Sequence, residues 1–323
     1  MTTVRTFVRR GFTTALVFIS FAGAAGFAAA PRPPFTQIVA FGDSLSDNGN
    51  LFALTGGAIP PASAYAGGRF SNGPVWIEQV AAELGLSGRL ADFAFGGACS
   101  GHDNYVGFEY KIPHLPGLAE ELDLYTAASG GRADPDALYV VAVGANDIFL
   151  WAESGMPTSL ADFATGIAAN VSAAVTRLHQ LGARHILVSD VADIGLTPYG
   201  LGSGLAPQLT GVSVTVNAAV DMALDRLACR GRIPTARFSM FAGLQDIVAA
   251  PADYGFAVID VPYLAVGAGD PDTFLFWDSV HPTTAGHAVL AEVALDALRE
   301  QHLLPPATPR RHHGPVHAGC GRN

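Results

Sequence analysis

Residues 38–50 read IVAFGDSLSDNGN, an apolar run that changes abruptly to small and polar residues at Gly42. Such a run is typical of a short buried strand, and the glycines and asparagines after it favour a turn. We therefore expect Ser44 at the carboxyl end of a strand, the edge where open α/β sheets bind ligands. Taken alone, the stretch leaves another interpretation open, because serine and aspartate also cap helices.

Around this stretch, short apolar runs alternate with longer amphipathic ones from Pro31 to Leu304. Residues 160–181 repeat apolar side chains every three or four positions, which is the spacing of an amphipathic helix. Alternating strands and helices predict an α/β fold in one domain, with a parallel sheet, helices on both faces and right-handed crossovers. We expect strands at 37–42, 92–96, 137–144, 184–190 and 256–261, and helices at 74–84, 118–128, 160–181, 212–230 and 283–301.

The composition is that of a folded globular protein, since half of the 323 residues are hydrophobic and 14% are charged. The formal net charge is −10 and the isoelectric point is near 5.3. A chain with this charge has no basic stripe to neutralise phosphates, so we expect no nucleic-acid partner. Nothing in the sequence predicts an oligomeric state.

The first 30 residues differ from the rest of the chain. Three arginines, the last at position 10, precede an uncharged run that ends in Ala28, Ala29 and Ala30. This pattern predicts that residues 1–30 are a signal peptide with an A-x-A cleavage site. An uncleaved membrane anchor is the alternative, although the many alanines and glycines favour cleavage.

Cleavage would start the mature chain near Pro31, and we expect a secreted or periplasmic protein. Residues 9–12, RRGF, also resemble the core of a twin-arginine signal. Without the three arginines, 15 basic residues face 28 acidic ones, a formal charge of −13. Such a surface disfavours anionic membranes, so we expect no stable membrane insertion after the signal is removed.

The three cysteines, Cys99, Cys229 and Cys320, are too few for a disulfide framework, although one pair could form in an oxidising compartment. No C-x-x-C or H-E-x-x-H spacing occurs, so we expect no metal. Residues 305–323 contain three histidines and Cys320 among prolines, glycines and arginines. A weak metal site is conceivable there, but the composition favours a disordered tail.

Further candidate site residues lie after the second and third expected strands and before the last expected helix. Gly97 lies in the string FGGACS after the second strand, and Asn146 follows the third strand in VGAND. Asp278 and His281 lie in WDSVHP, just before the last helix. Because the carboxyl ends of parallel strands meet at one edge, we expect these residues near Ser44.

These residue types belong to one kind of chemistry. A serine hydroxyl needs a base to act as a nucleophile, and His281 is the candidate base. A carboxylate fixes the tautomer of such a histidine, and Asp278 lies only three residues earlier. The N–H groups of Ser44 and Gly97 and the amide of Asn146 are candidates for an oxyanion hole, which stabilises the tetrahedral intermediate.

With these residues in place, the chain resembles the GDSL esterase/lipase family, also called SGNH hydrolases. The similarity is carried by FGDSLSD (41–47), Gly97, GAND (144–147) and DSVHP (278–282), in the family's order. The string GRFSNGPVW (68–76) is similar to the secreted bacterial and plant branch. The resemblance implies a flavodoxin-like three-layer α/β/α sandwich over residues 31–304. It also implies a triad of Ser44, Asp278 and His281, with Ser44, Gly97 and Asn146 forming the oxyanion hole.

Other residues near these strings have predicted supporting roles. We expect Asp43 and Asp47 to bond to turn amides and Asp147 to orient its loop. The segments 51–70 and 100–116 are predicted to shape the substrate site. Five aromatic residues there could line an acyl pocket, stack on a sugar or simply be buried at the surface: Tyr65, Phe70, Tyr105, Phe108 and Tyr110. The better pocket candidates lie just before the acid of the triad: Phe274, Phe276 and Trp277.

The sequence therefore predicts an exported serine ester hydrolase that cleaves lipid acyl or short-chain carboxylic esters through an acyl-enzyme, without a cofactor. Its partner would be a small-molecule, lipid or glycan ester. Three alternatives remain open: a carbohydrate O-acetylesterase, an acyltransferase, and a catalytically silent binding protein that uses the same cleft.

Overall fold

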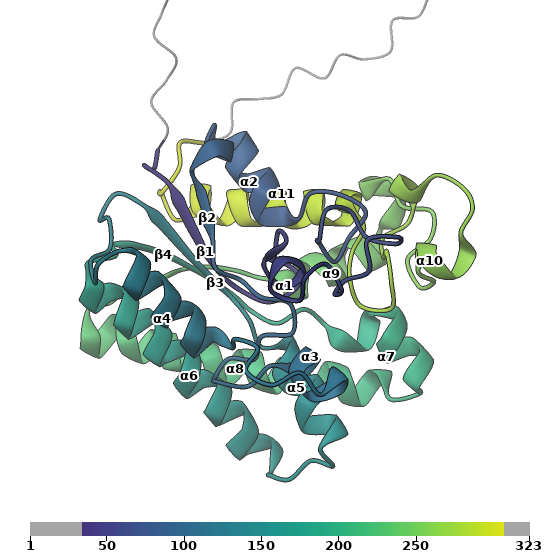
Figure 1. Cartoon of the computed structure of the whole chain (residues 1–323), viewed down its shortest axis with the longest axis horizontal. Coiled ribbons are helices and arrows are strands. Elements are labelled where there is room, and N and C mark those ends of the chain that lie inside the picture. Colours follow the sequence, from purple (N-terminus) through teal and green to yellow (C-terminus); the bar gives the residue numbers. More distant parts are fainter. Residues whose placement is uncertain (1–33, 307–323) are drawn as a thin grey trace, which may run out of the picture. The chain divides into compact units, whose positions relative to one another are not determined.

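A five-stranded parallel sheet forms the centre of the computed structural model, which describes residues 34–306 (Figure 1). The spatial order is β2-β1-β3-β4-β5, the order of flavodoxin-like doubly wound sheets. The predicted α/β class is therefore confirmed. The strands are β1 (Ile38–Gly42), β2 (Leu90–Asp92), β3 (Leu138–Ala142), β4 (His185–Ser189) and β5 (Ala236–Phe238). The predicted signal peptide (1–30) and residues 307–323 of the predicted tail lie outside the described residues.

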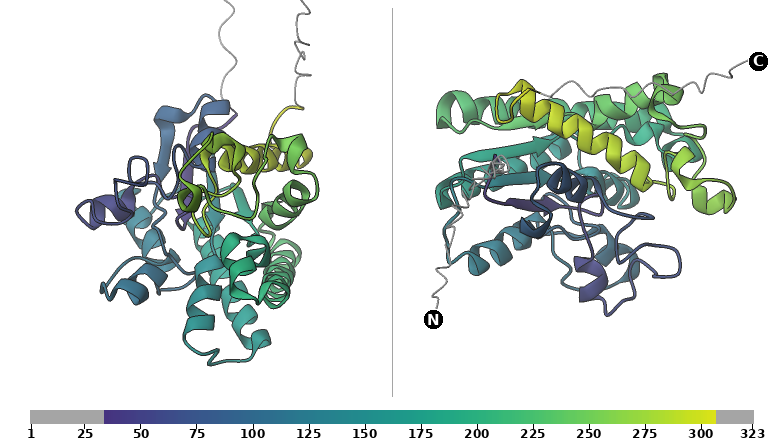
Figure 2. Two further views of the ribbon diagram at one scale, coloured as in Figure 1. Left: turned by 90° about the vertical axis from the view of Figure 1, so that its right-hand side faces the viewer. Right: turned by 90° about the horizontal axis from the view of Figure 1, so that it is seen from above.

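Helices cover both faces of the sheet, as Figures 1 and 2 show. One face packs against α4 (Leu118–Ala128), α6 (Leu160–Leu181) and α8 (Ala206–Arg226). The other packs against α2 (Trp76–Glu83), α11 (Thr284–Glu300) and the start of α9 (Met240–Ala249). Shorter helices connect these elements: α1 (Asn50–Leu54), α3 (Tyr105–Tyr110), α5 (Ala145–Glu153), α7 (Pro198–Ser203) and α10 (Tyr263–Val266).

The alternation of side chains along each strand divides the core in two. In β1, Val39 and Phe41 pack on the side of α4, α6 and α8, whereas Ile38 and Ala40 pack on the side of α2 and α11. All four are buried because the strand has helices on both faces. This is why residues 38–41 form a continuous apolar run rather than an alternating one.

Two predicted strands differ from the structure. The fifth strand is Ala236–Phe238, and the prediction of a strand at 256–261 is wrong. Phe256 is buried in a separate cluster with Leu275 and Phe276, and this burial produced the apolar pattern. The second strand is Leu90–Asp92, not 92–96, although the N–H groups of Phe93 and Phe95 still donate to the carbonyl oxygens of Ala40 and Gly42 in β1, at 2.8 and 3.0 Å.

All five predicted helices are present, but not all of their boundaries are correct. Helix α8 starts at Ala206 and ends at Arg226, six residues earlier than expected at its start and four at its end. Helices α5 and α9 were not predicted. Among the helices of residues 34–306, none combines the length and apolar character that crossing a bilayer requires.

Candidate active site

Ser44 lies in the turn directly after β1. The carbonyl oxygen of Asp43 accepts the N–H groups of Ser46 and Asp47, each at 2.9 Å, and a carboxylate oxygen of Asp43 accepts the N–H of Leu45 at 3.1 Å. The strand can end this way because Gly42 has no side chain, since a Cβ there would lie 2.2 Å from the carbonyl oxygen of Ala142 in β3. The tight turn leaves the Ser44 side chain at the cavity described below.

Asp278 and His281 share one short turn that precedes α11. The N–H of Trp277 donates to the carbonyl oxygen of His281 at 2.8 Å, which closes the turn. Oδ1 of Asp278 accepts the N–H groups of Val280 and His281 at 2.9 and 2.8 Å. The turn therefore fixes the carboxylate beside the imidazole ring, as the three-residue spacing suggested.

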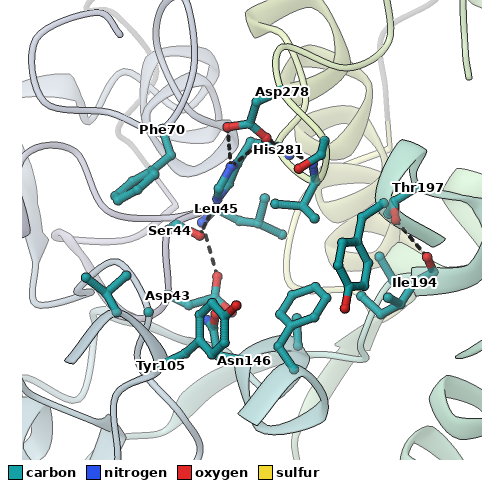
Figure 3. Close-up of a pocket in the computed structure, with 18 of the residues that line it drawn as sticks. Asp43, Ser44, Leu45, Phe70, Tyr105, Asn146, Ile194, Thr197, Asp278 and His281 are labelled. Atoms are coloured by element: carbon teal, nitrogen blue, oxygen red, sulfur yellow. Dashed lines mark hydrogen bonds and ion pairs between the residues drawn. The ribbon is translucent and has the colours of Figure 1, made fainter. Parts of the chain in front are cut away.

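The structure brings Ser44, His281 and Asp278 into a row (Figure 3). Nε2 of His281 lies 2.7 Å from Ser44 Oγ, and Nδ1 lies 2.7 Å from Asp278 Oδ2. Burial alone would raise the pKa of Asp278, but the neighbouring His281 and the donors around the carboxylate hold that pKa at about 2. Asp278 is thus a stable anion, while His281 Nε2 faces the serine hydroxyl.

Gly97 and Asn146 lie at the same edge of the sheet. Gly97 has φ +82°, and a Cβ there would meet Asn104 Oδ1 at 2.5 Å, so the position requires glycine. Asn146 is in the first turn of α5, which begins where β3 ends, and its amide donates to the carbonyl oxygen of Ala98 at 3.2 Å. Within residues 34–306, the N–H groups of Ser44 and Gly97 donate to no protein acceptor, although both residues line the cavity.

The acidic residues beside the site hold loops, as predicted. Asp47 accepts four N–H groups, and one of them, from Gly96 at 2.8 Å, ties the serine turn to the Gly97 loop. Asp147 accepts the N–H and the hydroxyl of Ser100 at 2.8 and 2.7 Å. Burial raises the pKa of both Asp43 and Asp147 to about 6.

A cavity of about 350 Å³ opens beside Ser44. As predicted, segments 51–70 and 100–116 contribute to its lining; their aromatic residues there are Tyr65, Phe70, Tyr105 and Tyr110. The prediction failed for Phe108, which is exposed outside the cavity. It was also wrong for Phe274, Phe276 and Trp277, which are buried in the protein and do not line the cavity.

Sequence reasoning missed the opposite wall of the cavity. It includes Ile194 and Thr197, from a segment after β4, as Figure 3 shows. Phe149 from α5 and Val280 from the triad turn also line the cavity. The segment after β4 contributes Val191, Ile194, Thr197 and Tyr199. The N–H of Tyr199 donates to the carbonyl oxygen of Ser279 at 2.8 Å, which fastens α7 to the turn that carries His281.

Two polar residues that support the site were also missed. Glu121 of α4 is fully buried, and its oxygens accept the N–H of Gly42 at 2.9 Å and that of Phe95 at 3.2 Å. A signal was present, because Glu121 lies on the apolar stripe formed by Leu118, Leu122 and Tyr125. Tyr65 donates to Asp278 Oδ2 at 2.7 Å, a contact that no sequence spacing indicates.

Other candidate sites are weaker. Within residues 34–306, no group of three or more His, Cys, Asp or Glu side chains is arranged to hold a metal ion. Cys99 is a buried free thiol and Cys229 an exposed one, and Cys320 lies outside the described residues. The three histidines of residues 305–323 lie there too, so the conceivable metal site of the tail is not described.

The sequence of this chain matches the family model for GDSL-like lipase/acylhydrolase over residues 38–294, which includes both Ser44 and His281. The chain belongs to the GDSL-like lipase/acylhydrolase family. This GDSL-like protein is a carboxylic ester hydrolase, as the resemblance implied.

Relatives of this GDSL-like enzyme have several activities in their names. Phosphatidylcholine-sterol acyltransferase of Aeromonas hydrophila is 28% identical over 324 residues, covering 85% of this chain and 93% of that protein. Secreted effector protein SseJ of Salmonella typhimurium is 26% identical over 282 residues, covering 83% of this chain and 64% of that protein. Among solved structures, the acetylxylan esterase Axe2 of Geobacillus stearothermophilus aligns over 81% of this chain and 93% of its own, with 14% identity and a TM-score of 0.43.

Proposed function

We propose that the enzyme cleaves carboxylic esters through an acyl-enzyme formed on Ser44. His281 takes the hydroxyl proton through Nε2 as Ser44 Oγ attacks the ester carbonyl, and then gives that proton to the departing alcohol. Water repeats the sequence in reverse, which releases the acid and regenerates Ser44. The observation that carries this proposal is the 2.7 Å distance from His281 Nε2 to Ser44 Oγ.

The oxyanion of each tetrahedral intermediate would be held by Ser44 N–H, Gly97 N–H and the Asn146 amide. Two of these donors make no bond to a protein acceptor within residues 34–306, which leaves them available for a ligand. Because they are fixed before the reaction, they need no reorganisation when charge develops.

The lining of the cavity supports an acyl ester with an apolar chain as the substrate. Leu45, Val143, Phe149, Ile194 and Val280 present hydrocarbon surface close to Ser44. We therefore place lipid acyl or short-chain esters ahead of acetylated glycans. Rates measured over p-nitrophenyl esters from acetyl to palmitoyl test this order, and a preference for acetylated sugars over all acyl chains would reverse it.

Transfer of the acyl group to an alcohol instead of water is the second candidate. It is favoured because a relative whose alignment covers 85% of this chain is named an acyltransferase. Both reactions proceed through the same acyl-enzyme, so the acceptor decides between them. Incubation with an acyl donor and a sterol or simple alcohol distinguishes the two, since only transfer yields a new ester.

Export is proposed from residues 1–30 together with a relative that is named a secreted effector. Expression of the full chain in a bacterial host should yield a mature protein outside the cytoplasm that begins near Pro31. Recovery of the protein in the cytoplasm with residues 1–30 intact would contradict the proposal.

The acyl-enzyme is tested by Ser44→Ala, because alanine removes the nucleophile and leaves the turn intact. The variant should lose p-nitrophenyl ester cleavage and labelling by a fluorophosphonate probe, and it should keep the thermal midpoint of the parent. Ser87→Ala, at an exposed position before β2, is the matched control and should keep both activities. If the Ser44→Ala variant keeps full turnover, or is still labelled by the probe, the mechanism is wrong.

A further inference from the structure

The carboxylate of Asp278 has a side-chain partner in addition to His281. The hydroxyl of Tyr65 donates to Asp278 Oδ2 at 2.7 Å, the same oxygen that lies 2.7 Å from His281 Nδ1. Oδ1 is occupied by the N–H groups of Val280 and His281. The Tyr65 hydroxyl is thus the donor that comes from outside the triad turn.

Tyr65 is suited to act as a permanent donor. Burial and the adjacent Asp278 carboxylate raise the pKa of its phenol above the ordinary value, so the hydroxyl keeps its proton over the working pH range. A hydrogen bond to a charged acceptor is stronger than one between neutral groups. The bond therefore contributes to both the position and the charge distribution of the carboxylate.

The loop that carries Tyr65 is fastened to the triad at several points. The indole N–H of Trp277, next to Asp278, donates to the carbonyl oxygen of Ala64 at 3.0 Å. The Tyr65 ring meets the Phe70 ring at a centroid distance of 6.1 Å, and Phe70 lies 5.0 Å from the His281 ring. These contacts therefore hold Tyr65 in a fixed position relative to both Asp278 and His281.

We propose that Tyr65 is a positioning residue that acts through Asp278. Its hydroxyl adds a fourth member to the hydrogen-bonded row of Ser44, His281 and Asp278. It fixes the Oδ2 atom that orients His281, because both groups bond to this same oxygen. This inference rests on the proposed function of Ser44, His281 and Asp278. Tyr65 also lines the cavity, so its ring and its hydroxyl have separate roles that must be tested separately.

Tyr65→Phe removes the hydroxyl and keeps the ring. We expect kcat to fall about tenfold, the typical effect of losing one hydrogen bond to a charged group, with KM changed less than about twofold. Without the hydroxyl, Asp278 Oδ2 loses the hydrogen bond that comes from outside the triad turn. The pH profile of kcat/KM should therefore change, which a merely structural role of Tyr65 would not cause.

Two further variants separate the hydroxyl from other effects. Tyr65→Leu also removes the ring that lines the cavity, so KM should rise in addition to the loss in kcat. Tyr254→Phe makes the same chemical change at an exposed site away from the cavity and should leave all parameters unchanged. Thermal midpoints identify any variant that fails to fold.

Labelling by a fluorophosphonate distinguishes failure of this inference from failure of the proposed function. If the parent protein is not labelled at Ser44, the proposed function fails. If the parent is labelled and Tyr65→Phe is labelled at the same rate, with unchanged kcat and pH profile, then Tyr65 does not position the triad. A rise in KM alone would likewise overturn the proposal, because it would assign Tyr65 to the cavity wall only.

Discussion

Asn146, the proposed side-chain donor of the oxyanion hole, also has a hydrogen bond within the fold. One N–H of its amide is held by the carbonyl oxygen of Ala98 at 3.2 Å, and the residue lines the cavity. The bond to Ala98 fixes the direction of the amide before any substrate arrives. A preorganised donor of this kind stabilises the transition state more than the ground state.

Asn146→Ala should therefore lower kcat by about a hundredfold while KM stays within a few fold, since loss of one oxyanion donor costs ~2.7–4 kcal/mol. Steady-state kinetics on a p-nitrophenyl ester measure both parameters. Asn48→Ala is the matched control, because this asparagine side chain makes no hydrogen bond within residues 34–306 and lies outside the cavity lining. A large rise in KM with unchanged kcat would assign Asn146 to substrate binding instead.

At the scale of single residues, the sequence pointed to those residues whose proposed chemical role requires one particular kind of side chain. Ser44 was ambiguous until His281 and Asp278 supplied a base and its partner. Tyr65 could not be found in this way, because a tyrosine in a loop has no spacing relation to an aspartate more than two hundred positions later. Glu121 could have been found, since an acid on an apolar helical stripe must have buried donors to satisfy it.

Helix α4 connects two loops of the active site through Glu121. Its two oxygens accept N–H groups from the end of β1 and from the segment leading to Gly97. The helix thereby connects the strand end before Ser44, the proposed nucleophile, with the segment before Gly97, a proposed oxyanion donor. A carboxylate suits this position because both oxygens are acceptors.

Glu121→Gln should destabilise the protein by about 1–3 kcal/mol, because an amide offers one acceptor oxygen and turns an NH2 group toward a buried N–H. The free energy of unfolding from urea titration measures this loss. Asp123→Asn, on the same helix but exposed and paired only with Arg177, should change it by less than about 0.5 kcal/mol. Equal effects of the two substitutions would refute the role of Glu121.

At the scale of elements, the strands that were predicted correctly are those whose two faces are both buried. Strands β1, β3 and β4 are covered on both faces and read as continuous apolar runs. Strand β5 is a three-residue edge strand whose central residue, Arg237, is partly exposed and bonds to acids on α8, so its pattern is not apolar. Residues 256–261 contain equally apolar residues, but these pack in a local cluster beyond the sheet.

For the molecule as a whole, buried acids determine how stability depends on pH. Burial raises the pKa of Asp43, Asp147 and Asp190 to about 6, so the folded state binds more protons than the unfolded state between pH 4 and 6. Stability must then fall as pH rises through this window. Asp278 has the opposite sign, because its lowered pKa makes a contribution that is lost as pH falls from about 4 to about 2.

The thermal midpoint should therefore be highest near pH 4, and lower by at least about 5 °C at pH 8, since ~1 kcal/mol shifts the midpoint of a chain this size by ~2–4 °C. Scanning calorimetry from pH 4 to 8 at constant ionic strength measures the trend. A midpoint that rises steadily toward pH 8 would show that burial does not raise the pKa of these acids.

The fold class was predictable at this scale because it depends on the alternation of whole segments and tolerates errors in any one boundary. The spatial order of the strands places β1 and β3 side by side, so the turns that carry Ser44 and Asn146 are neighbours although about a hundred residues separate them. The cavity was not predictable in the same way, because its second wall comes from a segment after β4 with no chemical motif.

The position of the triad along the chain has a consequence for biosynthesis. Ser44 follows the first strand, whereas Asp278 and His281 come immediately before the last helix, which packs against α2. A ribosome therefore produces Ser44, the proposed nucleophile, early and His281, its proposed base, only near the end. We expect a nascent or C-terminally truncated chain that lacks residues 278–281 to have no esterase activity, so activity should arise only when almost the entire polypeptide has been synthesised.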